Sequence, residues 1–241
     1  MASFFDTTIG QQVEFQRVLA SAGFTDSDIA RIIKEPNLAS TMYLAIQPKA
    51  VATVPSWWRT PEQQLERARQ LWPGRELPEP PEGFTPRTKS EVLLLHVPDT
   101  FDSLWDKVVA PEGYTKYRWE GVKADKRNLR LSPNKREYTE PVWLAFDPEH
   151  GKGERPDSFW GQADIAASEV FSALIQFPEW PLVWFNGASA PNLSGYQLKY
   201  DGNWSDVPYL DRWDDDRQLK LHGLWADCRG GHWSSPSVRE C

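Results

Sequence analysis

The sequence of 241 residues is poor in the features on which disulfide scaffolds and membrane anchors depend. Two cysteines, Cys228 and Cys241, are too few for a disulfide framework. We expect free thiols in a reducing compartment, although their spacing would allow one bridge in an exported protein. The longest apolar runs, residues 92–95 and 142–146, are far shorter than the roughly 20 residues of a membrane-spanning helix. These shortages exclude a disulfide-rich domain and predict a soluble protein without a membrane span.

The sequence also lacks targeting signals and strong catalytic signatures. Residues 1–10 contain no basic stretch followed by an apolar one, which is the usual sign of a secretory signal, so we expect a cytoplasmic protein. No P-loop, zinc-protease helix or nucleophile elbow is present. No single motif therefore identifies a function or a cofactor, and no cofactor is predicted.

Tryptophan, in contrast, is abundant. The chain holds 13 of them, and none comes before Trp57. Hydrophobic residues make up 40% and charged residues 25%, close to the average of globular domains. Such a density of indoles indicates an aromatic core, a stacking surface, or both.

The spacing of apolar residues divides the chain into three parts. Residues 1–48 repeat apolar side chains at helical intervals, which predicts a unit of three short helices that packs on the body or on a partner. Residues 49–89 are rich in proline and hold one helical stretch, 61–71, with Thr60 as its N-cap. Residues 90–241 form the body. Three indoles are expected to fasten the connector, residues 49–89, to the body: Trp57, Trp58 and Trp72.

Strand and helix patterns follow one another in the body without a repeat. The predicted strands are residues 91–97, 114–120, 128–131, 142–146, 196–200 and 218–221, and the predicted helices run from about 101 to 108 and from about 162 to 177. The fully apolar stretch 142–146 is expected at the centre of a sheet. The order predicts an α+β fold, in which a small helical unit and a Pro/Trp-rich connector precede a mixed or mainly antiparallel sheet with two packed helices.

The net charge of −7 conceals two segments of opposite charge. Residues 116–136 hold eight basic side chains against two acidic ones, and residues 201–216 hold six aspartates against one arginine. We interpret residues 114–136 as a basic hairpin, in which Lys116 and Arg118 share one face and the aromatic side chains share the other. That basic face could hold phosphates, or it is a solvated surface above an aromatic face that points into the core. The candidate anion-binding residues are Lys116, Arg118, Lys123, Lys126, Arg127 and Arg130.

The positions of the indoles separate core from possible surface. Trp105, Trp119, Trp143 and Trp225 stand at apolar-periodic positions and are predicted to be core. Six others lie in or beside loops, where they could stack on bases or sugars. These are Trp160, Trp180, Trp184, Trp204, Trp213 and Trp233.

Metal-ligand residue types occur near the C-terminus without the spacing of a metal site. His222, Cys228, His232 and Cys241 are of the residue types that bind zinc, but their intervals fit no compact zinc motif. Residues 201–205 resemble the first half of a calcium loop, but the later ligands are missing, so we predict a turn there and another at 214–216. No metal is predicted.

Several C-terminal motifs resemble those of a known group of proteins. They are Phe177-Pro178-Glu179-Trp180, Asn192-Leu193-Ser194-Gly195-Tyr196-Gln197, Val207-Pro208-Tyr209-Leu210-Asp211-Arg212-Trp213-Asp214-Asp215 and Pro236-Ser237-Val238-Arg239-Glu240-Cys241. The group is one of hypothetical proteins from ultra-small candidate-phylum bacteria. The resemblance runs from about residue 61 to the C-terminus, implies a bacterial cytoplasmic protein with one contiguous body, and implies no activity or site residues.

The patterns together predict a non-catalytic binding protein. Its expected partner is anionic, such as nucleic acid, or else another protein, and it binds at the basic hairpin. A carbohydrate-binding module that uses exposed tryptophans is an alternative. A hydrolase that uses carboxylates such as Glu169, Glu179 or Asp206 is another.

Overall fold

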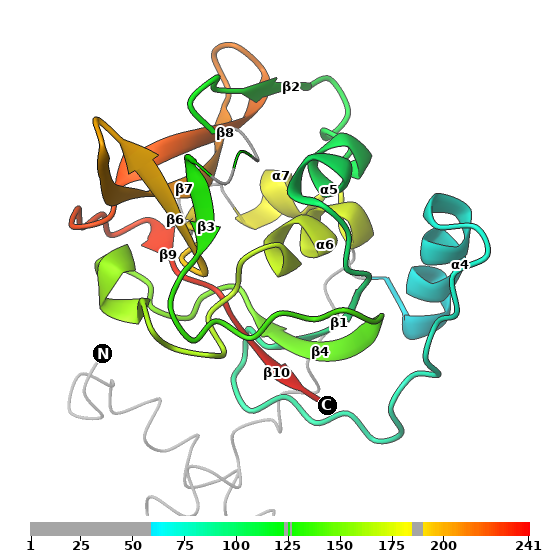
Figure 1. Cartoon of the computed structure of the whole chain (residues 1–241). Coiled ribbons are helices and arrows are strands. Elements are labelled where there is room, and N and C mark those ends of the chain that lie inside the picture. Colours follow the sequence, from blue (N-terminus) through cyan, green and yellow to red (C-terminus); the bar gives the residue numbers. More distant parts are fainter. Residues whose placement is uncertain (1–58, 123–124, 126, 185–189) are drawn as a thin grey trace, which may run out of the picture. The chain divides into compact units, whose positions relative to one another are not determined.

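The computed structural model divides the chain into two units, residues 1–54 and 55–241, and describes residues 59–122, 125, 127–184 and 190–241. The predicted three-helix unit, residues 1–48, and the first part of the connector with Trp57 and Trp58 lie outside the described residues. The described part has the predicted α+β fold, with a three-stranded sheet, a five-stranded mixed sheet and helices between them (Figure 1). None of its helices has the length and apolar character needed to cross a membrane.

Helix α4 (Pro61–Leu71) begins and ends where the sequence predicts. The Thr60 side chain accepts a hydrogen bond from the backbone N–H of Gln63, and the Gln63 side chain accepts one from the N–H of Thr60. This capping box, with Pro61 in the first turn, fixes the start of the helix. Trp72 follows the helix, is buried, and donates from its indole to Asp99 at 3.0 Å, so this part of the connector packs against the body.

The three-stranded sheet is antiparallel, with the order β1-β4-β10. Its strands are β1 (Val92–His96), β4 (Val142–Asp147) and β10 (Ser237–Glu240). The apolar strand β4 is the central one, as predicted, and five of its six residues are buried. The last strand of the chain thus pairs with a strand that lies about a hundred residues earlier in the sequence.

The outer edge of β1 is closed by one side chain of α4. Gln64 is fully buried; its Nε2 donates to the carbonyl of Leu93 at 3.0 Å, and its Oε1 accepts from the N–H of Leu95 at 2.8 Å. Edge strands otherwise present unpaired backbone groups, which are costly when they are removed from water. The Gln64 amide therefore replaces a neighbouring strand at this edge.

The five-stranded sheet has the order β2-β8-β7-β6-β3, with β2 parallel to β8 and the other pairs antiparallel. Both predicted turns are present: Asp201 and Gly202, with φ of 47° and 85°, join β6 to β7, and residues 214–217 join β7 to β8. The strands are β2 (Thr115–Arg118), β3 (Leu129–Leu131), β6 (Tyr196–Tyr200), β7 (Asn203–Trp213) and β8 (Gln218–Trp225). A short parallel pair completes the sheets, β5 (Ala190–Pro191) with β9 (Trp233–Ser234).

The prediction of a hairpin at residues 114–136 is wrong. Strands β2 and β3 both exist, but they lie at opposite edges of the five-stranded sheet and do not pair. The long β7–β8 ladder pairs eight residues of each strand, and β2 adds to the free edge of that ladder. Alternation in a sequence shows which side chains share a face, but it does not identify the neighbouring strand.

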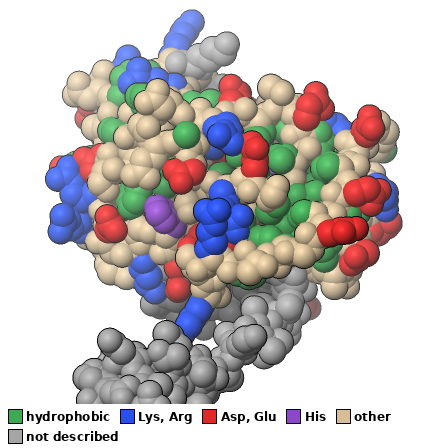
Figure 2. Space-filling view, turned by 90° about the horizontal axis from the view of Figure 1, so that it is seen from below, with side chains coloured by type: hydrophobic (Ala, Val, Ile, Leu, Met, Phe, Trp, Pro, Cys, Tyr) green, Lys and Arg blue, Asp and Glu red, His purple; other side chains and the backbone are tan. Residues whose placement is uncertain are grey.

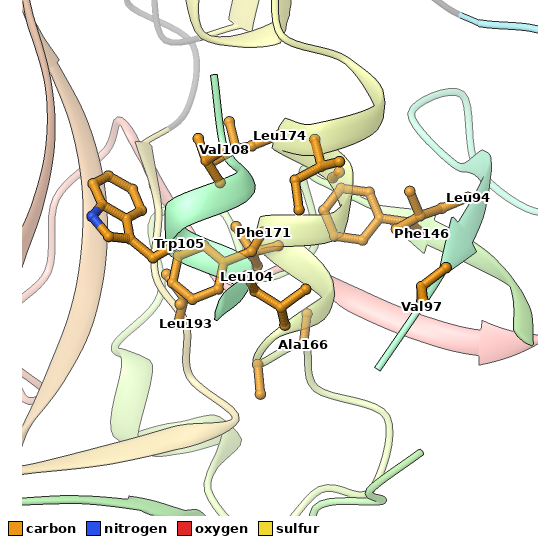
Figure 3. Close-up of a cluster of buried hydrophobic side chains, with 14 of the residues drawn as sticks. Leu94, Val97, Leu104, Trp105, Val108, Phe146, Ala166, Phe171, Leu174 and Leu193 are labelled. Atoms are coloured by element: carbon orange, nitrogen blue, oxygen red, sulfur yellow. The ribbon is translucent and has the colours of Figure 1, made fainter. Parts of the chain in front are cut away.

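Helices α5 (Phe101–Lys107), α6 (Glu169–Gln176) and α7 (Trp180–Trp184) lie between the two sheets, and a short 3-10 helix, η2 (Pro156–Phe159), precedes α6 (Figure 1). Every residue of α6 is buried. Figure 3 shows Phe171 and Leu174 of α6 packed among Leu104 of α5 and Phe146 of β4. This cluster is the centre of the hydrophobic core.

Helix α6 begins at Glu169, about seven residues later than predicted. Residues 163–167 are held by other backbone segments: Ala166 donates its N–H to Pro236 at 2.7 Å, and its carbonyl accepts from Gly195 at 2.8 Å. A Cβ placed on Gly195 would come within 3 Å of this segment, so the contact depends on small residues. Tertiary hydrogen bonds therefore override the helical preference of the alanines.

Replacing Gln64 tests the closure of the β1 edge. We expect Gln64→Ala to lower the free energy of unfolding by about 3 kcal/mol, because it leaves two buried backbone groups without partners. Gln70→Ala, an exposed position on the same helix, should change it by less than about 0.5 kcal/mol. Urea unfolding followed by circular dichroism measures both, and equal values for the two variants would contradict the assignment.

Candidate functional site

Lys116, a predicted anion-binding residue, is used by the neighbouring helix. Its Nζ donates to the carbonyls of Trp105 at 2.7 Å and Asp106 at 3.0 Å, at the C-terminal end of α5. Its ammonium also lies 5.2 Å from the centre of the Trp105 ring. Burial lowers the pKa of Lys116, while the Asp106 charge opposes that change. The positive charge thus serves the carbonyl end of a helix, where cations are stabilising.

Arg118 is engaged in the same way. It forms an ion pair with Asp102, donates to the carbonyl of Val122, and lies over the ring of Phe101 at 5.3 Å. Because both cations of β2 turn toward α5, Tyr117 between them turns outward and is 41% exposed. The basic side chains of β2 face α5 instead of open solvent. The prediction that the aromatic side chains of this segment point into the core is therefore wrong for Tyr117.

The remaining candidates of the basic segment are dispersed. Lys123 and Lys126 lie outside the described residues, and the side chain of Arg127 is exposed. Arg130 donates from Nε to the Gln197 side chain at 2.8 Å, and its guanidinium lies 4.1 Å from the centre of a Trp204 ring. Arg130 also borders a pocket.

That pocket has a volume of about 460 Å³. Strand β3, the segments 98–101 and 135–138, the start of α6 and Tyr196 enclose it. Its apolar wall consists of Pro98, Phe101, Leu129, Leu131 and Ala167. Its polar wall consists of Asp99, Thr100, Arg130, Lys135, Arg136, Glu137, Tyr138, Ser168, Glu169 and Tyr196.

A buried ion pair forms part of the polar wall. Lys135 Nζ lies 2.7 Å from Glu169 Oε1, and the two side chains are 1% and 2% exposed. Lys135 also donates to the carbonyl of Arg136, and Glu169 accepts from the N–H of Ala167. Burial alone would raise the pKa of Glu169, but the Lys135 charge and the hydrogen bonds outweigh it and hold that pKa below its usual value. Glu169 therefore stays charged beside the Lys135 ammonium, and the hydrogen bonds of both side chains offset part of the cost of burying the pair.

His96 lies next to this pair. Its Nδ1 is 2.8 Å from the hydroxyl of Ser172 on α6, and its ring meets the ring of Tyr138 edge to face at 5.7 Å. Burial lowers the pKa of His96 to about 4, opposed by the Glu169 charge and assisted by the Lys135 charge. The histidine is therefore neutral at pH 7, and it joins β1 to α6.

The two phenols of the pocket are also shifted. Burial raises the pKa of Tyr138 to about 12, and burial likewise raises the pKa of Tyr196. Both hydroxyls therefore remain protonated at neutral pH and can donate a hydrogen bond to a ligand.

The three carboxylates considered for a hydrolase are not together. Glu169 is in the pocket with both oxygens bound by the protein, Glu179 is exposed, and Asp206 is buried in β7. Of these three, only Glu169 lines the pocket. Glycoside hydrolysis needs two carboxyl groups on either side of one bond, and this trio does not supply them.

The burial of the tryptophans agrees only in part with the prediction from the sequence. Trp105 and Trp143 are core, as predicted, whereas Trp225 is 63% exposed, because it ends β8. Trp180, expected beside a loop, is 1% exposed and meets Phe146 edge to face. Trp119, Trp160, Trp204 and Trp233 are half-buried, Trp213 is 46% exposed, and the Trp184 side chain lies outside the described part.

Both cysteines are free thiols. Among the described residues, no group of three His, Cys, Asp or Glu side chains could hold a metal ion, so His222, Cys228, His232 and Cys241 are not gathered into such a group. The His222 ring instead stacks on Trp119, with ring centres 4.9 Å apart.

No family model matches the chain, and neither a curated protein nor a solved structure matches it. The pocket and the exposed rings are the features of the described residues that bear on function.

Breaking the buried ion pair tests its role. We expect Lys135→Met and Glu169→Gln each to lower the free energy of unfolding by about 3–5 kcal/mol, because each substitution leaves the partner's charge buried without an opposite charge. The double variant should lose less than the sum of the two. Urea unfolding of all three variants measures this coupling, and strictly additive losses would show that the two ions act independently.

The shift of His96 predicts a pH dependence. The unfolded chain binds a proton at His96 near pH 6.5, but the folded protein binds it only near pH 4, so stability is complete above pH 6.5 and declines as the pH falls toward 4. Between pH 7 and pH 5 this loss amounts to about 2 kcal/mol. His96→Gln should remove that part of the decline in urea unfolding, whereas His150→Gln, in the loop after β4, should keep it. An unchanged decline in His96→Gln would contradict the assignment.

Proposed function

We propose that the protein is a non-catalytic binding protein for a small organic acid, which it takes into the pocket of about 460 Å³. The observation that carries the proposal is Arg130, a cation at the border of that pocket for which no carboxylate of the described residues is a partner. The other two cations of the lining are paired, Lys135 with Glu169 and Arg136 with Glu240. Arg130 is thus the cation available to an acidic ligand.

The surroundings hold the Arg130 guanidinium in place without neutralising it. Its hydrogen bond goes to the uncharged amide of Gln197, and one side of its plane lies on the Trp204 ring. Both contacts reduce the freedom that the side chain would lose on binding. An arginine prepared in this way suits a carboxylate, which it can bind through two parallel N–H groups.

The walls of the pocket fit the rest of such a ligand. Phe101, Leu129 and Leu131 offer apolar surface for a hydrocarbon body. The protonated hydroxyls of Tyr138 and Tyr196 add donors on the polar side. The volume lies within the range of roughly 300–1,000 Å³ that is usual for small-molecule pockets.

A small acid fits these observations better than an extended nucleic acid. Binding of a phosphate chain requires several cations along one surface, and Lys116 and Arg118 are already bound to α5. Seen from below, the surface shows basic and acidic side chains interspersed with hydrophobic ones (Figure 2). The face in this view thus carries no continuous basic surface of described residues along which a phosphate chain could bind.

Titration with octanoate and 1-octanol tests the proposal by isothermal calorimetry. We expect the acid to bind and the alcohol to bind at least tenfold more weakly, because only the acid can pair with Arg130. Arg130→Gln should remove the preference for the acid, whereas Arg127→Gln, on the exposed loop before β3, should keep it. Equal binding of acid and alcohol would overturn the proposal, as would an Arg130→Gln variant that retains the preference. Tight binding of a labelled oligo(dT) that survives Arg130→Gln would favour nucleic acid instead.

A further inference from the structure

The outer surface of the five-stranded sheet carries a row of aromatic rings. Lys116 and Arg118 show which surface is the inner one, because they contact α5, and Tyr117 points the opposite way. In the strand register Tyr117 of β2 pairs with Lys220 of β8, and Lys220 pairs with Asp211 of β7. Trp213 lies two residues after Asp211 and therefore on the same side of β7. We call the rings on this surface the aromatic face: Tyr117, Trp119, Tyr209, Trp213 and His222.

Two of these rings are widely open to solvent. Tyr117 and Trp213 are 41% and 46% exposed. Large aromatic side chains are normally buried, and exposed ones that share a sheet surface indicate a binding site. The two rings belong to β2 and β7, on either side of β8, so the exposed aromatic surface extends across neighbouring strands.

The rings support one another. Trp119 stacks on His222 with centres 4.9 Å apart and planes 12° apart. Tyr209 follows at 5.9 Å from His222. Such mutual contacts restrict ring rotation, which lowers the entropy lost when a ligand binds.

The charges of the aromatic face are balanced within it. Lys220 lies between Tyr117 and Trp213, with its Nζ 3.3 Å from the centre of the Trp213 ring, and it pairs with Asp216 at 3.0 Å. Asp211 accepts a hydrogen bond from the Trp213 indole at 3.1 Å. An anionic chain would therefore meet carboxylates beside these rings, and it would find Lys220 already paired.

We infer that the aromatic face binds a neutral oligosaccharide. A pyranose ring has C–H groups on its faces, which pack on aromatic rings, and hydroxyls around its edge, which hydrogen-bond to side chains such as those of Asp211 and Asp216. A pyranose is uncharged and polar, so it suits a surface on which the charged side chains beside the rings are already paired with one another. A chain of several sugars matches rings that extend over three strands. This site is separate from the pocket and does not depend on the organic-acid proposal, because none of its rings lines the pocket.

Calorimetry with three neutral hexasaccharides, cellohexaose, chitohexaose and mannohexaose, tests the inference on the full chain. We expect at least one of them to bind, and Trp213→Ala and Tyr117→Ala each to weaken that binding about tenfold. Trp225→Ala is the matched control: Trp225 is the more exposed indole, but strand alternation places it on the other side of β8 from Lys220 and His222. This control should bind like the unchanged protein, and so should Arg130→Gln.

Three results would overturn the inference. One is that none of the three hexasaccharides binds to the protein while its circular dichroism shows that it is folded. Another is that Trp213→Ala and Trp225→Ala weaken binding equally. The third is that oligo(dT) binds at this surface and loses its binding in Trp213→Ala, which would assign the aromatic face to nucleic acid.

Discussion

A helix that is buried along its whole length must find partners for its polar side chains inside the protein, and three side chains of α6 do so, Gln176 through its amide nitrogen only. Glu169, Ser172 and Gln176 follow one another at intervals of three and four residues, which places them on one side of the helix. Glu169 pairs with Lys135, Ser172 with His96 of β1, and Gln176 makes a long contact of 3.5 Å to the backbone of Gln64 in α4. One polar stripe in the core therefore connects α6 with Lys135, β1 and α4, which are distant in the sequence, and the pair of Glu169 with Lys135 forms part of the pocket wall.

The basic segment shows how a local excess of charge can be structural. Four of its cations support other parts of the protein: Lys116 binds carbonyls of α5, Arg118 and Arg136 pair with acids on other segments, and Lys135 pairs in the core. A sequence shows the number of charges but not their partners, because partners come from elsewhere in the chain. Of the three described cations that line the pocket, Arg130 is the one without an acidic partner.

The local features of the fold were predictable, while the pairing of the strands was not. Helix α4 follows from Thr60 and Pro61, and the central position of β4 follows from its apolar run, because each depends on neighbours in the sequence. The parallel pairing of β2 with β8 has no local signal. The pocket was missed for the same reason, since Lys135 and Glu169 come together only through tertiary structure. The exposure of Trp225 and Tyr117 likewise depends on where a strand ends and on which of its sides faces the core. The alternation of residue types in the sequence shows neither of these.

The distance along the chain between paired strands has a consequence for folding. Strand β2 pairs with β8, and β4 with β10, across about a hundred residues in each case, so both sheets join early parts of the body to late ones. Contacts of such long range make folding slow, because a large loop must close before any of them stabilises the chain. During synthesis, β4 and β2 must remain without these partners until almost the whole body has left the ribosome. Until then the edge of β4 that later receives β10 is open, and an open edge of an apolar strand favours aggregation.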